Sequence, residues 1–304
     1  MQYLERGGIK LAYEMFGSGA PAVVLIHGWC DDHTMMEGMA AHFGLRHQVL
    51  SVDLRGHGQS DKPESDYSVA AFADDMAWMC DRLDIRQPLI IGHGLGGAVA
   101  RDLAACYFDL PAAIVALEGV ILSPDAAREA GQSLAEALRT PAWREAMRGF
   151  IDAGFTPTDD PELRRKAHAE LEHLPQHMLA SVAEQMLFWD AATAAETCRV
   201  PALYIEAGSG LSDLDQFKAL CPQLMVGKTF GVDHQLVATP EQVNAMIDRF
   251  IAIELCRDTV PTAWQQSAWT WRRDSAELCR PSIQSERRFR NAVSKPLFHL
   301  KTTR

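Results

Sequence analysis

The chain has 304 residues, of which 47% are hydrophobic and 23% charged, and its formal net charge is −11. This composition is typical of a globular protein with a sizeable core, and the acidic balance argues against a nucleic-acid partner. No run of about 18 apolar residues occurs, so we expect no membrane span. The first residues lack the basic-then-apolar order of a signal peptide, and the seven cysteines form no C-x-x-C pair. Both features predict a cytoplasmic protein with free thiols.

Strands and helices alternate in most of the chain. Short apolar runs predict strands at residues 23–26, 49–53, 88–91, 113–117, 202–205 and 224–226. Helices are expected over 68–84, with Ser68 as the candidate N-cap, and over 96–107. A last helix is expected over 240–254, with Pro240 in its first turn after the candidate N-cap Thr239. This alternation predicts an α/β protein with a mostly parallel sheet and helices on both of its faces.

Strand signals vanish between residues 124 and 197, where helices are predicted over 127–139, 141–153, 161–173 and 176–190. Helices inserted between two sheet strands suit a cap over the edge where open α/β folds bind ligands. We therefore predict a core in two parts, residues 1–123 and 198–256, interrupted by a helical cap over 124–197. Residues 257–304 form a basic C-terminal extension with ten Lys or Arg against four Asp or Glu.

A glycine stands where a nucleophile is expected. The segment from Gly92 to Gly97 reads G-H-G-L-G-G and lies between a predicted strand and an alanine-rich helix. The pattern G-x-S-x-G forms a nucleophile elbow, a tight turn that exposes the serine hydroxyl. Gly94 occupies the position of that serine, whereas the small flanking residues are intact. The segment therefore marks the place of a nucleophile but lacks the reacting atom.

Residues 1–254 resemble the α/β-hydrolases that carry a helical cap. The resemblance rests on His27-Gly28-Trp29, the run D-L-R-G-H-G-Q-S at 53–60, the elbow at 92–97, and Asp233-His234 before the last helix. It implies that Gly94 holds the nucleophile position and that His234 is the catalytic base. It also implies that the backbone N–H groups of Trp29 and Leu95 bind the oxyanion, a role that does not depend on the serine.

Two carboxylates are candidates for the acid that orients His234. Glu118 follows the strand 113–117, where a carboxylate would be partly buried and would need a charged partner such as an imidazolium. Asp213 follows the strand 202–205 in a glycine-rich segment, and its alternative role is the N-cap of a helix over 213–220. We favour Glu118 and keep Asp213 as the alternative.

Three functions are compatible with these residues. The first is hydrolysis of a hydrophobic carboxylic ester or lactone, silenced or impaired in this chain by Gly94. The second follows from Gly28-Trp29-Cys30, which is similar to a segment of the cofactor-independent quinolone 2,4-dioxygenases. That resemblance implies that His234 deprotonates a 3-hydroxy-4-quinolone before O₂ cleaves its ring, with the acid at Glu118. The third is a non-catalytic pseudoenzyme that binds a ligand.

The predicted pocket is apolar. Its candidate lining residues are His27, His93, Met35, Phe188 and Trp189. The expected ligand is therefore a small hydrophobic ester, lactone or aromatic compound. The sequence shows neither a glycine-rich phosphate loop nor the spacing of a metal-ligand cluster, so no cofactor and no metal are predicted. The sequence leaves a homo-oligomer open.

Overall fold

The computed structural model describes residues 1–119, 125–157, 159–207, 212–230, 234–238 and 240–255. Their centre is an eight-stranded sheet in the order β1-β2-β4-β3-β5-β6-β7-β8. β1 (Gln2–Arg6) pairs antiparallel with β2 (Ile9–Phe16), which pairs antiparallel with β4 (Val49–Val52). The other neighbours are parallel: β3 (Val23–Ile26), β5 (Leu89–His93), β6 (Ala113–Leu117), β7 (Ala202–Glu206) and β8 (Leu224–Lys228).

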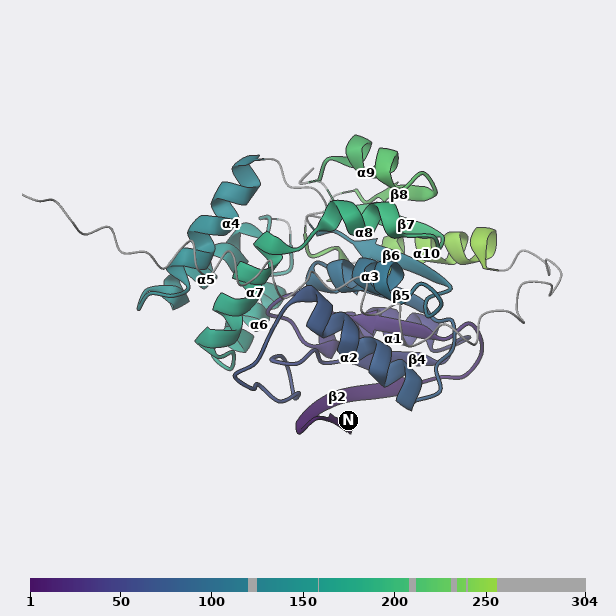
Figure 1. Cartoon of the computed structure of the whole chain (residues 1–304), viewed down its shortest axis with the longest axis horizontal. Helices are drawn as coiled ribbons and strands as arrows, with labels where there is room; N and C mark the ends of the chain where they lie inside the picture. Colours follow the sequence, from purple (N-terminus) through teal and green to yellow (C-terminus); the bar gives the residue numbers. More distant parts are fainter. Residues whose placement is uncertain (120–124, 158, 208–211, 231–233, 239, 256–304) are drawn as a thin grey trace, which may run out of the picture. The chain divides into compact units, whose positions relative to one another are not determined.

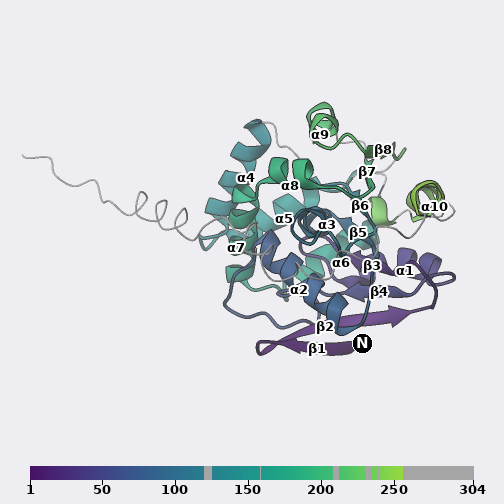
Figure 2. The ribbon, with the colours of Figure 1, turned by 45° about the vertical axis from the view of Figure 1, so that its right-hand side comes forward.

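Helices cover both faces of the sheet (Figures 1 and 2). α1 (Glu37–Phe43) and α10 (Pro240–Glu254) pack on one face, whereas α2 (Val69–Arg82), α3 (Leu95–Cys106) and α8 (Ala191–Thr197) pack on the other. Successive residues of strand β3 point to opposite faces of the sheet and so contribute to both hydrophobic cores. Val23 and Leu25 join the core under α1 and α10, whereas Val24 and Ile26 join the core under α2 and α3. The predicted α/β class with a mostly parallel sheet is confirmed.

Four helices follow β6 and gather at one end of the sheet (Figure 1). They are α4 (Asp125–Ala137), α5 (Trp143–Ala153), α6 (Pro161–Leu171) and α7 (Gln176–Phe188), and we call them the helical insertion. Met147, Leu171 and Met178 bury their side chains in the core that also contains α2 and α3. All four helices were predicted, and each of their ends lies within two residues of the expected position.

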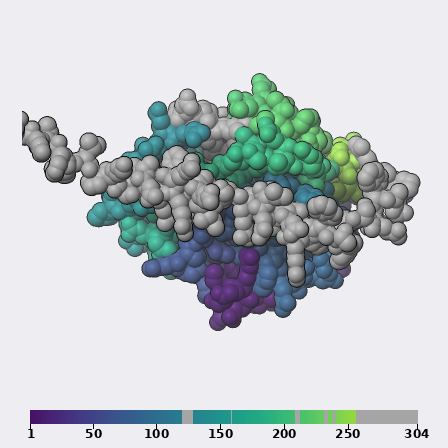
Figure 3. Space-filling model, in the orientation of Figure 1, coloured from purple at the N-terminus to yellow at the C-terminus, as the bar shows by residue number. Residues whose placement is uncertain are grey.

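Some elements were not predicted. The antiparallel pair β1–β2 lies at the sheet edge, where polar residues face solvent and blur the alternation that marks a strand. In the space-filling view these N-terminal strands are the purple atoms, on the side away from the green C-terminal elements (Figure 3). α1 and α8 have seven residues each, which is too short for a clear helical period.

The ends of two predicted helices agree with the structure. Ser68 caps α2 by accepting a hydrogen bond from Ala71 N, and Pro240 opens α10. Thr239, Asp233 and residues 257–304 lie outside the described part of the chain. Within the part described, no helix combines the length and apolarity that crossing a bilayer requires.

Candidate active site

The turn between β5 and α3 places Gly94 at the carboxyl edge of the sheet. Its φ of 51° and ψ of −110° lie in a region that is costly for residues with a side chain. Gly94 N donates to Leu117 O at the end of β6 (3.0 Å), and Gly94 O accepts from Gly97 N (3.1 Å) as the helix begins. This turn has the sharp strand-to-helix form of a nucleophile elbow.

His234 lies beside Gly94. A β-carbon at position 94 would be 3.6 Å from His234 Cε1 and 3.7 Å from His234 Nε2, which are ordinary van der Waals contacts. A hydroxyl on that carbon could therefore reach Nε2 within hydrogen-bonding distance. The structure thus brings together the nucleophile position and the base that the sequence analysis proposed.

A buried imidazole, that of His93, supports the backbone of His234. His93 Nε2 lies 2.9 Å from the carbonyl oxygen of His234 and donates to it, because a carbonyl can only accept. His93 Nδ1 faces Asp31 Oδ2 at 3.6 Å, and both side chains are buried. This approach is longer than a hydrogen bond, and Nδ1 has no hydrogen-bond partner among the described residues. Burial opposes the ionisation of Asp31, yet the nearby imidazole of His93 holds the pKa of Asp31 below its ordinary value.

His234, the candidate base, is neutral at neutral pH. Burial is the largest cause that lowers the pKa of His234 to about 3, and the charge of His93 adds to it, whereas Asp31 opposes the shift. The two imidazole rings are close, with 4.7 Å between their centroids. A neutral imidazole keeps one ring nitrogen free to accept a proton, as a general base must.

Two backbone N–H groups border the same space. Gly28 Cα would be 3.8 Å from a β-carbon at position 94. Trp29 is the next residue, so its backbone N–H group is close to this position. Leu95 is the first residue of α3. Among the described residues, neither Trp29 N nor Leu95 N has a hydrogen-bond acceptor. Such donors beside an elbow can stabilise an oxyanion.

The two candidate acids lie in different surroundings. Glu118 is 2% exposed, has a φ of 51°, and accepts a hydrogen bond from Ala207 N after β7. Asp213 is exposed and caps α9 (Leu214–Leu220) by accepting from Gln216 N (2.9 Å). Neither carboxylate is joined to the His234 ring by a hydrogen bond or ion pair between described residues. Burial makes Glu118 the better candidate.

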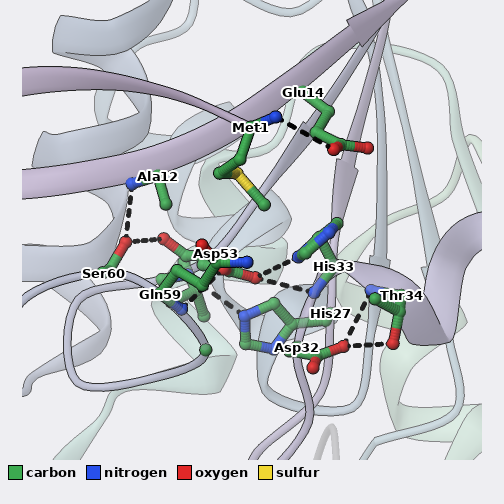
Figure 4. Close-up of polar contacts among 12 residues, drawn as sticks. Met1, Ala12, Glu14, His27, Asp32, His33, Thr34, Asp53, Gln59 and Ser60 are labelled. Carbon is green, nitrogen blue, oxygen red and sulfur yellow. Dashed lines mark hydrogen bonds and ion pairs between the residues drawn. The ribbon is translucent and has the colours of Figure 1, made fainter.

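His27 and Asp53 shape the loops around the elbow (Figure 4). His27 Nε2 accepts from Leu54 N (3.1 Å), so its proton is on Nδ1, which donates to Gly28 O (2.7 Å). Asp53 Oδ1 accepts from both N and Nδ1 of His33 at 2.8 Å. This hydrogen bond raises the pKa of His33. It also holds the pKa of Asp53 below its ordinary value, although burial opposes this.

The other three predicted pocket residues, Trp189, Phe188 and Met35, make their contacts away from the elbow. Trp189 Nε1 donates to Asp102 Oδ1 on α3 (3.0 Å). Phe188 is 69% exposed at the end of α7. Met35 packs against the core under α1 and α10. Among the described residues, no hydrogen bond or ring contact joins any of the three to Gly94 or His234.

Residues of the site that the sequence analysis missed include Asp31 and part of α5. A β-carbon on Gly154, at the end of α5, would lie 3.7 Å from His234 Cδ2. The Phe150 ring of α5 lies 5.1 Å from the Trp29 ring. The one signal for Asp31 was an acidic residue in the loop after a buried strand. The contacts of α5 had no local signal.

A small hollow lies within the helical insertion. Its volume is about 150 Å³, and it is lined by Phe155, Thr156, Pro157, Asp159, Asp160, Pro161 and Arg164. The lining comes from the α5–α6 connection and the start of α6, and it includes neither Gly94 nor His234. Within the described ranges, no three His, Cys, Asp or Glu side chains are grouped as a metal site requires.

Known proteins share this architecture. The enol-lactonase of Burkholderia xenovorans matches 83% of this chain and 100% of its own, with a TM-score of 0.73 and 20% identity. The family described as alpha/beta hydrolase fold matches residues 21–159. This protein has the α/β-hydrolase fold. The turn at Gly94 lies within the part of the chain that the family model matches.

Sequence relatives match a smaller part of this α/β-hydrolase-fold chain. An uncharacterized protein of Mycobacterium tuberculosis is 46% identical over 104 residues, which cover 34% of this chain and 30% of that protein. The 2-(acetamidomethylene)succinate hydrolase of Mesorhizobium japonicum is 35% identical over 112 residues, or 37% of this chain and 40% of that enzyme. The matched segments thus span less than half of either curated relative.

Proposed function

We propose that this chain is a hydrolase of carboxylic esters or lactones in which Gly94 stands in the place of the nucleophilic serine and silences or impairs turnover. The observation that carries the proposal is the distance of 3.7 Å between a β-carbon at position 94 and His234 Nε2. A neutral His234 supplies the general base, and the N–H groups of Trp29 and Leu95 supply the donors for the oxyanion. Glu118 is the proposed acid, and Asp213 the alternative.

We propose a small hydrophobic ester or lactone as the substrate and the helical insertion as a cap over the site. Two contacts support this arrangement, the packing of Phe150 on Trp29 and the approach of Gly154 to His234. The printed names of the similar proteins, a lactonase and a hydrolase, agree with it. No cofactor enters this chemistry. Cys30, Cys80, Cys198 and Cys221 are free thiols, which suits the proposed cytoplasmic location.

The test restores the hydroxyl. Gly94→Ser is compared with Gly94→Ala, since both variants carry a β-carbon at a positive φ but only the serine carries a nucleophile. With a panel of p-nitrophenyl esters and lactones, the serine variant should be at least about 10³-fold faster than the alanine variant. It should also show a burst of acyl-enzyme formation. Replacing His234 by alanine in the serine variant should remove this gain.

The outcome against the proposal is clear. If a folded Gly94→Ser variant is as inert as Gly94→Ala across the panel, the chain is not a silenced hydrolase. Saturable binding of an ester by both variants without turnover would instead indicate a ligand-binding pseudoenzyme.

One observation supports a second candidate, a cofactor-independent dioxygenase. Glu118 is buried at the end of β6, the acid position of the quinolone 2,4-dioxygenases that the Gly28-Trp29-Cys30 segment resembles. In that reaction His234 would deprotonate the substrate and Gly94 would only weaken its binding. Oxygen uptake with a 3-hydroxy-4-quinolone by the chain as it stands would support this candidate. No uptake by either this chain or Gly94→Ser would exclude it.

A further inference from the structure

Two cysteines lie at the amino ends of neighbouring strands. Cys198 ends α8 and precedes β7, and Cys221 ends α9 and precedes β8. The two strands are parallel and pair from Ala202 and Leu224 onward. Cys198 stands four residues before Ala202, and Cys221 three residues before Leu224, so the chain enters the two strands side by side. This edge of the sheet is opposite to that of Gly94, which follows the carboxyl end of β5.

Direct contacts hold the two cysteines together. Gln223 Nε2 donates to Cys198 O (2.8 Å) and to Val200 O (3.3 Å). Because Gln223 is two residues after Cys221, these bonds tie the chain around one cysteine to the backbone of the other. The thiols are also side-chain hydrogen-bond partners of each other. Cys198 is 3% and Cys221 1% exposed, so each thiol keeps the other as a neighbour in the core.

We propose that Cys198 and Cys221 form a site of reversible oxidation, at which a peroxide converts the two thiols into a disulfide. Side chains that already share a hydrogen bond need only a small adjustment to bring their sulfur atoms to bonding distance. Both are free thiols in this structure, which is the reduced form of such a pair. Disulfides of reducing compartments are usually transient and redox-sensing. The proposal goes beyond the proposed function, because the pair shares no residue with the site at Gly94.

The surroundings favour Cys198 as the attacking thiol. The hydrogen bond from Cys221 is the largest cause that lowers the pKa of Cys198 to about 7, and the charge of Arg199 adds to it, whereas burial opposes it. The same contact raises the pKa of Cys221. Cys30 and Cys80 are also buried, but burial raises their pKa values, to about 12 for Cys80. We therefore expect these two residues to remain thiols.

The oxidation balances with hydrogen peroxide as the oxidant. The Cys198 thiolate forms a bond to one peroxide oxygen, the O–O bond breaks, and the departing hydroxide takes up the proton that the thiol released. The Cys221 sulfur then attacks the sulfur of the Cys198 sulfenic acid. The S–O bond breaks, and the oxygen leaves as water with the proton of Cys221. The two sulfur atoms together lose two electrons, the peroxide gains them, and the products are one disulfide and two water molecules.

The disulfide should stabilise the part of the chain that it closes into a loop. The loop from 198 to 221 contains all of β7, together with Ala207, whose N–H group donates to Glu118. Joining the ends of a loop removes conformations from the unfolded chain. For a loop of this length in a domain of this size, we expect the melting temperature to rise by at least about 5 °C on oxidation.

The experiment treats the full chain with excess hydrogen peroxide, then denatures it, alkylates the remaining thiols with iodoacetamide and digests it with trypsin. Trypsin cleaves after Arg199 and Lys218, which both lie between the two cysteines, so a disulfide would join two separate peptides. Mass spectrometry should find the linked pair at the summed mass less two hydrogen atoms. Dithiothreitol should separate the pair and reverse the rise in melting temperature.

Cys221→Ser and Cys80→Ala are the matched variants. Each removes one buried thiol, but only the first removes the partner of Cys198. Cys80→Ala should form the linked peptides as the parent chain does. Cys221→Ser should form none, and its melting temperature should not rise on oxidation. Dimedone should instead label Cys198 in this variant, since no second thiol resolves the sulfenic acid.

Three outcomes would overturn the proposal: peroxide leaves both cysteines open to alkylation, it carries Cys198 to the sulfinic acid without a cross-link, or it links Cys198 to a different cysteine. Peptide mapping of the unaltered chain decides among them, so the test does not depend on the folding of a variant. Its readout is the state of two thiols. The result is therefore independent of whether Gly94→Ser hydrolyses an ester.

Discussion

His93 Nε2 donates a 2.9 Å hydrogen bond to the carbonyl oxygen of His234, which brings a second imidazole ring to 4.7 Å from that of the candidate base. The carboxylate of Asp31 lies 3.6 Å from the other ring nitrogen of His93, Nδ1. A catalytic acid would raise the pKa of His234, whereas burial and the neighbouring His93 lower it. The arrangement therefore keeps the base unprotonated well into the acidic range, at the cost of basicity.

Replacing His93 by glutamine should raise the pKa of His234. A glutamine amide can still donate to the His234 carbonyl oxygen, but it carries no charge. Burial, the larger cause of the low value of about 3, remains, so the pKa should recover only part of the way toward 6.5. Titration of the His234 ring by NMR measures the change, and it needs no enzymatic activity. An unchanged or lowered pKa would mean that His93 does not lower the pKa of His234.

Stability should depend on pH through His57. Its ring is fully buried, and this burial is the largest cause that lowers its pKa to about 3 from 6.5. Above the unfolded pKa both states are neutral, so this contribution is fully present. As the pH falls toward the folded pKa, only the unfolded chain takes up the proton, so the free energy of unfolding falls by about 1.4 kcal/mol per pH unit.

The comparison of parent chain and His57→Asn isolates this contribution. Urea unfolding between about pH 6 and pH 4 should show a slope that is smaller by about 1.4 kcal/mol per pH unit in the variant. The asparagine amide can still donate to Arg55 O, as His57 Nδ1 does at 3.1 Å. Equal slopes would mean that His57 titrates alike in both states.

The two candidate acids should respond differently to loss of charge. In the Gly94→Ser background, Glu118→Gln should lower kcat/KM by about 10²-fold or more, as expected for a positioned catalytic group. Asp213→Asn should leave activity and stability unchanged, since asparagine caps a helix as well as aspartate does. Steady-state kinetics on one ester compares the two. The opposite ranking would assign the acid to Asp213.

The close approach of strand and helix at the elbow should make Gly96→Ala severely destabilising. A β-carbon there would lie 2.3 Å from Ile26 O and 2.7 Å from His27 O, so backbone must move. We expect a loss of about 3 kcal/mol or more. Gly149→Ala is the control, because Gly149 is exposed on α5 and its β-carbon would meet nothing within 4 Å. This variant should increase the free energy of unfolding by about 0.5–1 kcal/mol. Urea denaturation measures the free energy of unfolding of both variants. A small loss for Gly96→Ala would mean that the elbow is loosely packed.

Much of the fold was accessible from local patterns. A parallel strand such as Val23–Ile26 is buried on both faces, and this leaves a continuous apolar run that can be recognised in isolation. The helical insertion was predictable because prolines and apolar periodicity are local signals. The edge pair β1–β2 and the seven-residue helices α1 and α8 were missed because exposure or short length removes those signals.

The same distinction between local sequence signals and tertiary contacts applies to the candidate site. The sequence by itself determined that a strand-to-helix elbow carries glycine at position 94 and that a histidine follows late in the chain. Only the tertiary structure decided that His234 faces this glycine, that Asp31 and His93 lie close together beside His234, and that the end of α5 approaches His234. The physical reason is that these groups come from separate loops, which meet only when the parallel strands align their carboxyl ends. Burial then sets their charges, because desolvation depends on neighbours that are distant in sequence.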